Sequence, residues 1–299
     1  MIHAQTPGLA VIAPVLFVLL WSTGYVGAKF GLPYAEPFTF LSIRLLLAML
    51  ALFALAVILR EHLPNRMQTF HAAIAGLLLH AGYLGGVFFG IKLGVPAGLS
   101  AIIVNLQPVL TSSLAARALG EDVGARQWLG LACGFVGVMF AIAEKMTGFD
   151  QVQAPAVIAC LVALLSSTVG TVYQKRFGSS TPLITGTLVQ YLASSVVFVT
   201  IAFAFETRIV QWTTPFVLTL AWFVGPISLG AILLLLWMIR HGSTTRVSSL
   251  FYLVPPLTAL EAYFLFGERL GWTAFVGLIL TMIAVALIVG RNEKPLEPT

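Results

Sequence analysis

The sequence has few charged residues and almost no cysteine. Asp, Glu, Lys and Arg make up 9% of the 299 residues, hydrophobic residues make up 59%, and the mean hydropathy is +0.98. A soluble domain needs a charged, hydrated surface, so this composition excludes one and indicates an integral membrane protein. Cys133 and Cys160 lie within apolar runs without ligand-like spacing, which argues against a disulfide framework or a cysteine metal site.

The motifs of common enzyme classes are also missing. The sequence has no phosphate-binding glycine-rich loop with a lysine, no His-Glu-x-x-His, no Gly-x-Ser-x-Gly and no clustered pair of aspartates. We therefore expect a protein that is not an enzyme, has no ATP site, and holds no cofactor and no metal.

What the sequence does contain is a series of apolar runs. About 20 helical residues cross the ~30 Å of hydrocarbon in a bilayer. Ten runs satisfy this length: 9–28, 37–59, 70–91, 95–116, 125–143, 154–174, 181–205, 213–239, 244–266 and 271–290. The predicted fold class is therefore all-α integral membrane, with ten transmembrane helices. No Lys or Arg precedes the first run and a second run follows closely, so we expect the first helix to be retained.

The basic residues predict the orientation, because Lys and Arg in short loops stay in the cytoplasm. With the N-terminus inside, the inner side holds ten Lys and Arg residues and the outer side five, and Arg44 lies within the second run. We therefore expect both termini in the cytoplasm. The net charge of +5 then reflects this topology, and the basic residues on the inner side can also contact anionic lipid headgroups. The charge does not support nucleic-acid binding.

One pattern of glycine, proline and glutamate occurs twice, with its proline inside an apolar run each time. Its members are Gly94, Pro108, Gly120, Glu121 and Gly130 in the first copy, and Gly242, Pro256, Gly267, Glu268 and Gly277 in the second. Since each half has five runs, an odd number, the second half must enter the membrane with the opposite orientation. We predict that residues 1–150 and 151–299 are inverted five-helix repeats with a site between them.

The residues that precede this pattern resemble a known family. Residues 20–31, followed by Pro37-Phe38 and Arg44, resemble the opening of an EamA-type transporter of the drug/metabolite transporter superfamily. The repeated pattern resembles that family's closing signature in each half. The resemblance covers nearly the whole chain and implies a ten-helix exporter in the bacterial inner membrane. The aromatic-rich spans are similar to the branch that exports aromatic and other neutral amino acids.

The primary hypothesis is thus a monomer in the lipid bilayer that exports amino acids by alternating access, driven by an ion gradient or the solute's own gradient. An exporter of drugs or other metabolites in the same superfamily is the nearest alternative. A membrane-embedded lipid or isoprenoid enzyme is the alternative from another class, but it would need a charged, metal-binding or phosphate-binding cluster at a membrane face. A channel would need polarity along a whole pore, whereas here polarity gathers at the midplane.

Pro108 and Pro256 mark candidate helix breaks near that midplane. A proline lacks an N–H and clashes with the preceding turn, so it frees backbone carbonyls that need a polar partner. Matching breaks in the two halves predict a central cavity, and a packing kink is the alternative.

Polar and aromatic residues near the breaks are candidate substrate ligands, because an amino acid needs donors, acceptors and an apolar wall. The candidates are Trp21, Ser22, Thr23, His80, Tyr83, Asn105, Gln107, Ser167, Trp237 and Tyr252. The alternative for each is helix packing, since Ser and Thr in membrane helices often join neighbouring helices.

Three of the ionisable residues inside the spans stand out. His80 is the middle residue of the third span, and its repeat partner is Ser228. It is a proton site, a donor to substrate, or a neutral histidine bonded to another helix. Glu261 and Arg44 have two interpretations. In the first, Glu261 takes up a proton and couples transport to a proton gradient. In the second, the opposite charges of Glu261 and Arg44 form a structural ion pair.

Glycines recur at helical spacing in two spans and predict close helix contacts. We expect Gly130, Gly134 and Gly137 of the fifth span to pack against the tenth span. Glu121 and Glu268 fall at loop ends, where a role in loop structure is expected.

Overall fold

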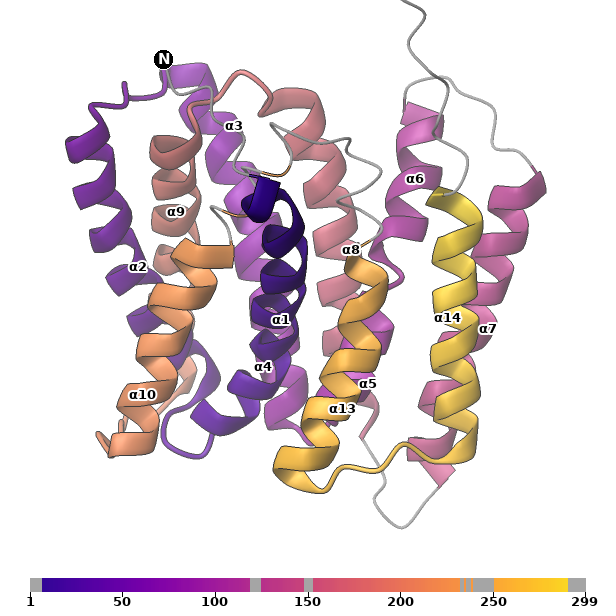
Figure 1. The fold of residues 1–299 in the computed structure, drawn as a ribbon. Coiled ribbons are helices and arrows are strands. Elements are labelled where there is room, and N and C mark those ends of the chain that lie inside the picture. Colours follow the sequence, from indigo (N-terminus) through magenta and orange to yellow (C-terminus); the bar gives the residue numbers. More distant parts are fainter. Residues whose placement is uncertain are drawn as a thin grey trace, which may run out of the picture.

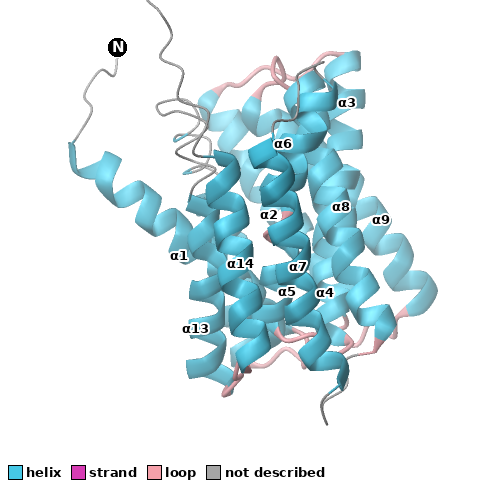
Figure 2. Ribbon diagram, turned by 90° about the vertical axis from the view of Figure 1, so that its right-hand side faces the viewer, coloured by secondary structure: helices cyan, strands magenta, loops and turns pink. Residues whose placement is uncertain are grey.

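The computed structural model describes residues 7–118, 125–147, 153–231, 234, 238 and 250–289. Within these ranges the regular secondary structure is helical, apart from one isolated β-bridge between Ala35 and Val210. The helices stand side by side in one bundle (Figure 1), and their connections gather at its two ends (Figure 2). Helix α1 begins and α14 ends at the same end of the bundle.

The described residues of the first half form seven α-helices and one π-helical segment. They are α1 (Pro7–Gly31), α2 (Pro37–Leu59), α3 (Arg66–Gly76), the π-helical segment η1 (Leu77–Gly82), α4 (Tyr83–Lys92), α5 (Ala97–Val104), α6 (Gln107–Ala118) and α7 (Ala125–Thr147).

The described elements of the second half follow a similar order. They are α8 (Ala154–Phe177), α9 (Leu183–Phe205), α10 (Thr214–Trp222), the π-helical segment η2 (Phe223–Ala231), the 3-10 turn η3 (Phe251–Leu253), α13 (Val254–Phe266) and α14 (Trp272–Val289).

Helix length and composition agree with a multi-pass membrane protein. Among the described residues, six helices are long and apolar enough to cross a bilayer, and four shorter apolar helices of 10–17 residues accompany them. Large apolar side chains face outward, among them Ile58, which is 75% exposed, and Phe205, which is 83% exposed. In water such faces would be unstable, whereas in lipid they are the favoured surface. The predicted all-helical membrane class is confirmed at this level.

The described chain leaves α-helical geometry shortly before Pro108 and Pro256. Helix α5 ends at Val104, α6 begins at Gln107, and Asn105 lies in the turn between them. Before Pro256 the chain forms η3, and α13 starts with proline in its first turn. Proline suits the first turn of a helix because backbone N–H groups there have no carbonyl partner within the helix, so the missing N–H of proline breaks no bond.

Helices α2 and α9 run antiparallel and lie side by side (Figure 1). Glu61 follows α2, and its Oε2 accepts hydrogen bonds of 2.8 and 2.7 Å from the amides of residues 184–185 at the start of α9. Glu206 follows α9 and accepts bonds of 2.8 and 2.7 Å from the amides of residues 38–39 at the start of α2. Each carboxylate satisfies amides that have no partner within their own helix.

Helices α7 and α14 form a close contact through glycine. A Cβ atom added at Gly137 would lie 2.7 Å from the carbonyl oxygen of Gly277, and one added at Gly134 would lie 3.3 Å from the Cβ of Ala284. The backbones can approach this closely only because these positions lack side chains. The prediction that Gly134 and Gly137 of the fifth span pack against the tenth is confirmed.

Candidate functional site

The two π-helical segments lie at corresponding places in the two halves. Segment η1 contains His80 and η2 contains Ser228, the residue that the repeat pairs with His80. Such segments are rare, and they frequently occur at functional sites because the widened turn frees backbone groups and redirects side chains. Each segment also receives a polar side chain from a helix of the other half: Gln190 of α9 at η1, and Arg44 of α2 at η2.

His80 begins a chain of side-chain hydrogen bonds. Its Nε2 lies 3.1 Å from Oε1 of Gln190, and Nε2 of Gln190 donates to Oε1 of Gln174 over 3.2 Å. With a carbonyl oxygen as its partner, Nε2 of His80 is the donor. The ring of Tyr191 meets His80 edge-on at a centroid distance of 4.9 Å. His80 is thus bonded to a neighbouring helix, which was one of the expected alternatives.

Arg44 is the buried cation of this region, with only 5% of its surface exposed. Its Nε and Nη2 each lie 3.4 Å from Oγ of Ser228, and its guanidinium stands 4.4 Å from the centroid of the Phe223 ring. Arg44 therefore contacts mainly hydroxyl and aromatic groups.

The possible structural pair of Arg44 with Glu261 is not formed, and that interpretation was wrong. Oε1 of Glu261 instead accepts a 2.7 Å hydrogen bond from Oγ of Ser22, which joins α13 to α1. Oγ1 of Thr258 donates to the carbonyl of Ser22 over 3.3 Å. The two charges stay apart because α13 packs on α1, whereas Arg44 of α2 lies against η2. Oε2 of Glu261 is buried without a hydrogen-bond partner among the described residues.

The other candidates on α1 have different surroundings. The ring of Trp21 packs against Phe17 and Phe251, at centroid distances of 5.2 and 5.5 Å. Oγ1 of Thr23 accepts a 3.0 Å hydrogen bond from Nε1 of Trp222, an exposed residue of α10, so Thr23 joins helices near the outer surface of the bundle.

Tyr83 is the first residue of α4, and its hydroxyl lies 3.2 Å from that of Tyr25 on α1. Tyr83 is therefore both a candidate ligand and a contact between the first and third spans.

The break between α5 and α6 has its own polar contacts. Nε2 of Gln107 donates to Oγ1 of Thr171 over 2.7 Å and lies 3.5 Å from the carbonyl of Ser167, both on α8. Oγ of Ser167 bonds to the carbonyl of Leu164 in its own helix. Asn105 is 7% exposed, and its Nδ2 has no hydrogen-bond partner among the described residues. Trp237 and the side chain of Tyr252 lie outside the described residues.

The sequence reasoning missed Gln190, Tyr191 and Gln174. All three lie within long apolar runs, where a glutamine is unusual. An uncharged amide in the middle of a membrane span is the signal that could have found Gln190, because a buried amide needs partners on another helix.

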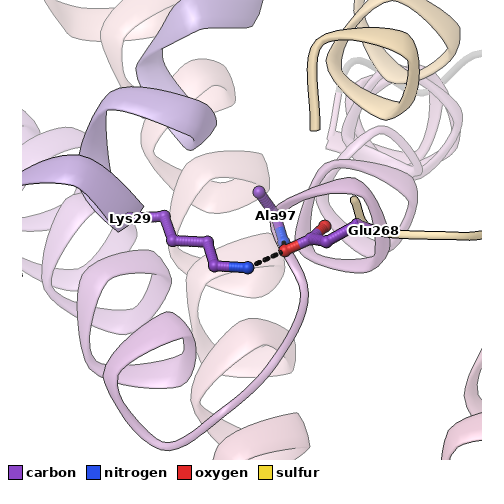
Figure 3. Close-up of polar contacts among 3 residues, drawn as sticks. All are labelled: Lys29, Ala97 and Glu268. Carbon is purple, nitrogen blue, oxygen red and sulfur yellow. Dashed lines mark hydrogen bonds and ion pairs between the residues drawn. The ribbon is translucent and has the colours of Figure 1, made fainter. Parts of the chain in front are cut away.

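An ion pair joins three spans at one end of the bundle (Figure 3). Nζ of Lys29, at the end of α1, lies 2.6 Å from Oε1 of Glu268, which follows α13. The amide of Ala97, at the start of α5, donates to the same oxygen over 3.4 Å. The expected structural role of Glu268 agrees with these bonds. In the part of the chain that the structure describes, no other ion pair is formed.

A helical membrane bundle with polar side chains inside its spans is typical of a membrane transporter. The chain belongs to the EamA-like transporter family, whose model matches residues 8–143 and, a second time, residues 154–290. The resemblance seen in the sequence motifs is thereby confirmed.

Three curated relatives align with nearly the whole chain. The uncharacterized transporter YvbV of Bacillus subtilis (strain 168) is 29% identical, with 93% of this chain and 94% of that protein covered. The probable amino-acid metabolite efflux pump of Salmonella typhimurium is 26% identical, with 92% and 93% covered. The uncharacterized inner membrane transporter YedA of Escherichia coli (strain K12) is 25% identical, with 94% and 90% covered.

A solved crystal structure shares the fold. It aligns with a TM-score of 0.66 and 18% sequence identity, and the alignment covers 96% of this chain and 99% of that one.

Proposed function

We propose that this chain exports amino acids, including aromatic ones, and related small metabolites across the bacterial inner membrane by alternating access through a central cavity. One observation carries the proposal: polar side chains from both halves of the chain meet at the two π-helical segments, Arg44 at Ser228 and Gln190 at His80. A solute bound among these groups touches both halves, so its binding depends on how the halves are arranged. This dependence is what alternating access requires.

The arrangement of α2 and α9 supports two inverted repeats, residues 1–150 and 151–299, with five spans each. Glu61 and Glu206 occupy corresponding positions after these helices, and the amides they cap, residues 184–185 and 38–39, also correspond. Two related helices that run antiparallel are what an axis in the membrane plane generates. The family model also matches each half separately.

The substrate class rests on the site's chemistry and on the relatives. The ring of Phe223 offers aromatic surface, and the guanidinium of Arg44 offers a cation 4.4 Å from its centroid. Tyr25 and Tyr83, whose hydroxyls lie 3.2 Å apart, add aromatic side chains from α1 and α4. This combination suits a small solute with an aromatic side chain and a charged head group. Relatives named probable amino-acid metabolite efflux pumps agree with this class.

Localisation and assembly complete the proposal. A relative named an inner membrane transporter supports insertion in the bacterial inner membrane. We propose that both termini face the cytoplasm, since α1 begins and α14 ends at one end of the bundle and the basic residues favour that side. The protein works as a monomer in the lipid bilayer.

Uptake of radiolabelled phenylalanine and threonine into proteoliposomes, with and without a pH gradient, tests the proposal. We expect saturable uptake by the wild type and at least about tenfold slower uptake by Gln190→Leu, which breaks the hydrogen-bond chain from His80. Thr200→Val is the matched control, because Thr200 is exposed on α9 and bonds only within its own helix. Uptake of cationic dyes but of neither amino acid would overturn the substrate class.

A further inference from the structure

Arg44 is a buried cation without an acidic partner in the described part of the chain. The carboxylate inside a neighbouring span, Glu261, bonds to Ser22 instead, and the one ion pair of the described residues lies at the end of the bundle. The contacts of Arg44 are two long bonds of 3.4 Å to a single hydroxyl, that of Ser228, and the face of Phe223.

These contacts satisfy only part of what a guanidinium needs. It has five N–H donors in a planar fork, and ordinary N–H to oxygen bonds measure about 2.7–3.2 Å. A charge inside a membrane protein is costly unless it is paired or well hydrogen-bonded. A single hydroxyl and an aromatic ring offset part of that cost, so the surroundings of Arg44 are suited to receiving an anion.

We infer that Arg44 binds the carboxylate of the transported solute. The inference rests on the proposed function and assigns its substrate class: small carboxylates, among them amino acids. A carboxylate accepts two parallel bonds from a guanidinium fork, a geometry that lysine cannot reproduce. The hydroxyl that Arg44 contacts belongs to Ser228, and it is a further donor to the same anion.

The charge of the site favours a carboxylate over a phosphate ester. Arg44 is the only Lys or Arg well inside an apolar run of the sequence. One guanidinium balances the single negative charge of a carboxylate, whereas a phosphate dianion would leave one charge uncompensated in a medium that does not solvate it.

The site would also connect the two halves of the chain. Arg44 lies on α2 of the first half and Ser228 on η2 of the second. An anion held by both is bound most tightly when these elements are close, so its binding energy changes with their separation. Such differential binding is the only way in which a ligand can shift a conformational equilibrium.

Three compounds test the inference by how far each raises the unfolding temperature of the purified protein. Phenylalanine has a carboxylate, phenylalaninamide lacks it, and phenylpyruvate keeps it but lacks the ammonium group. Titration of each compound gives an apparent Kd. We expect the wild type to bind phenylalanine at least about tenfold more tightly than phenylalaninamide, the usual effect of one charged hydrogen-bonded contact.

Arg44→Gln should bring this ratio close to one, and Arg44→Lys should give an intermediate value. Arg176→Gln is the matched control, because Arg176 is exposed near the end of α8, and it should keep the wild-type ratio. A purely structural role of Arg44 would weaken the binding of acid and amide alike and leave the ratio unchanged. An unchanged ratio in Arg44→Gln therefore overturns the inference.

Two further outcomes separate the inference from the proposed function. If the wild type binds phenylalanine and its amide equally, Arg44 is not the carboxylate receptor, although amino-acid export stands. If it binds phenylpyruvate but not phenylalanine, and Arg44→Gln loses that binding, the amino-acid proposal fails and the inference holds. Should Arg44→Gln not fold, the ratio in Arg44→Lys decides, since a value equal to that of the wild type overturns the inference.

Discussion

Glu61 and Glu206 perform the same capping role at opposite ends of one antiparallel helix pair. Glu206 accepts two backbone amides and the hydroxyl of Thr39 at the start of α2, and Glu61 accepts two backbone amides at the start of α9. The pair α2–α9 is therefore fixed at both ends by bonds between the two halves of the chain. Its ends should move little when other spans rearrange.

The capping bonds predict a stability order. Glu206→Ala loses three hydrogen bonds and should destabilise the protein by about 1–3 kcal/mol, with Glu61→Ala somewhat milder because it loses two. Thermal unfolding in detergent measures both effects. Gln153→Ala is the control, since Gln153 precedes α8 without a side-chain capping bond. An equal effect of all three substitutions would contradict the capping role.

Glu36 predicts a dependence of stability on pH at the membrane surface. The hydroxyl and the amide of Thr207 each donate a 2.6 Å bond to Oε2 of Glu36. The hydroxyl bond is the main cause that lowers the pKa of Glu36; partial burial opposes it, and the amide and the charge of Lys92 add to the lowering. A lowered pKa in the folded state stabilises the fold above the unfolded-state pKa of about 4.3.

This stabilisation is lost as the pH falls through the lower folded-state pKa. Wild type should therefore unfold at a higher temperature than Glu36→Gln near neutral pH, and the difference should shrink below about pH 4. The effect should be small, because Glu36 is close to the surface and solvent screens its interactions. Unfolding temperatures of both proteins between about pH 3 and 7 test this, and a difference that does not change with pH would count against it.

The close contact between α7 and α14 predicts that a methyl group added at Gly137 destabilises the protein. In Gly137→Ala the new Cβ would meet the carbonyl oxygen of Gly277, which belongs to a helix backbone and cannot rotate away. We expect a loss of about 1–3 kcal/mol, the usual cost of overpacking. Gly24→Ala on α1 is the matched control, because no atom lies within 4 Å of its added Cβ. Similar unfolding temperatures for the two variants would show that the helices are not closely packed.

The repeated motifs and the apolar runs were sufficient to predict an all-helical membrane protein of the EamA family. They also pointed to Pro108 and Pro256, before which the described chain leaves α-helical geometry, since a proline inside a helix acts on its own local backbone. The partners of Arg44 and Glu261 could not be predicted. Partners depend on which helices become neighbours, and periodicity along one span does not contain that information. The amide of Gln190 in the middle of a span was a visible signal, but its partner His80 could not be predicted for the same reason.

The pair Lys29–Glu268 predicts a modest coupling energy. The side chain of Lys29 is 37% exposed, so water screens the attraction and a double-mutant cycle with Lys29→Met and Glu268→Gln should give about 1 kcal/mol or less. Added salt should reduce it further. A coupling of several kcal/mol that does not change with salt would show that the pair is buried in the membrane-embedded protein.

We predict that Glu261 carries the proton if a proton gradient drives transport. Its Oε1 accepts from Ser22, while its Oε2 is buried without a partner in the described residues, so the carboxyl can hold a proton without losing an existing bond. Glu261→Gln imitates the protonated form permanently. We expect this variant to keep phenylalanine exchange in proteoliposomes but to lose uptake driven by a pH gradient.

His80→Gln is the comparison for Glu261→Gln, because Gln can still donate a hydrogen bond toward Gln190 but does not titrate. With Glu261 as the proton carrier, His80→Gln should change the KM for phenylalanine and preserve the response to the gradient. The opposite pattern, with gradient-driven uptake lost in His80→Gln and kept in Glu261→Gln, would assign the proton to the π-helical segment η1. Ser22→Ala distinguishes the hydrogen bond of Glu261 from its ability to bind a proton, since it removes the donor to Oε1 and leaves the carboxyl able to titrate.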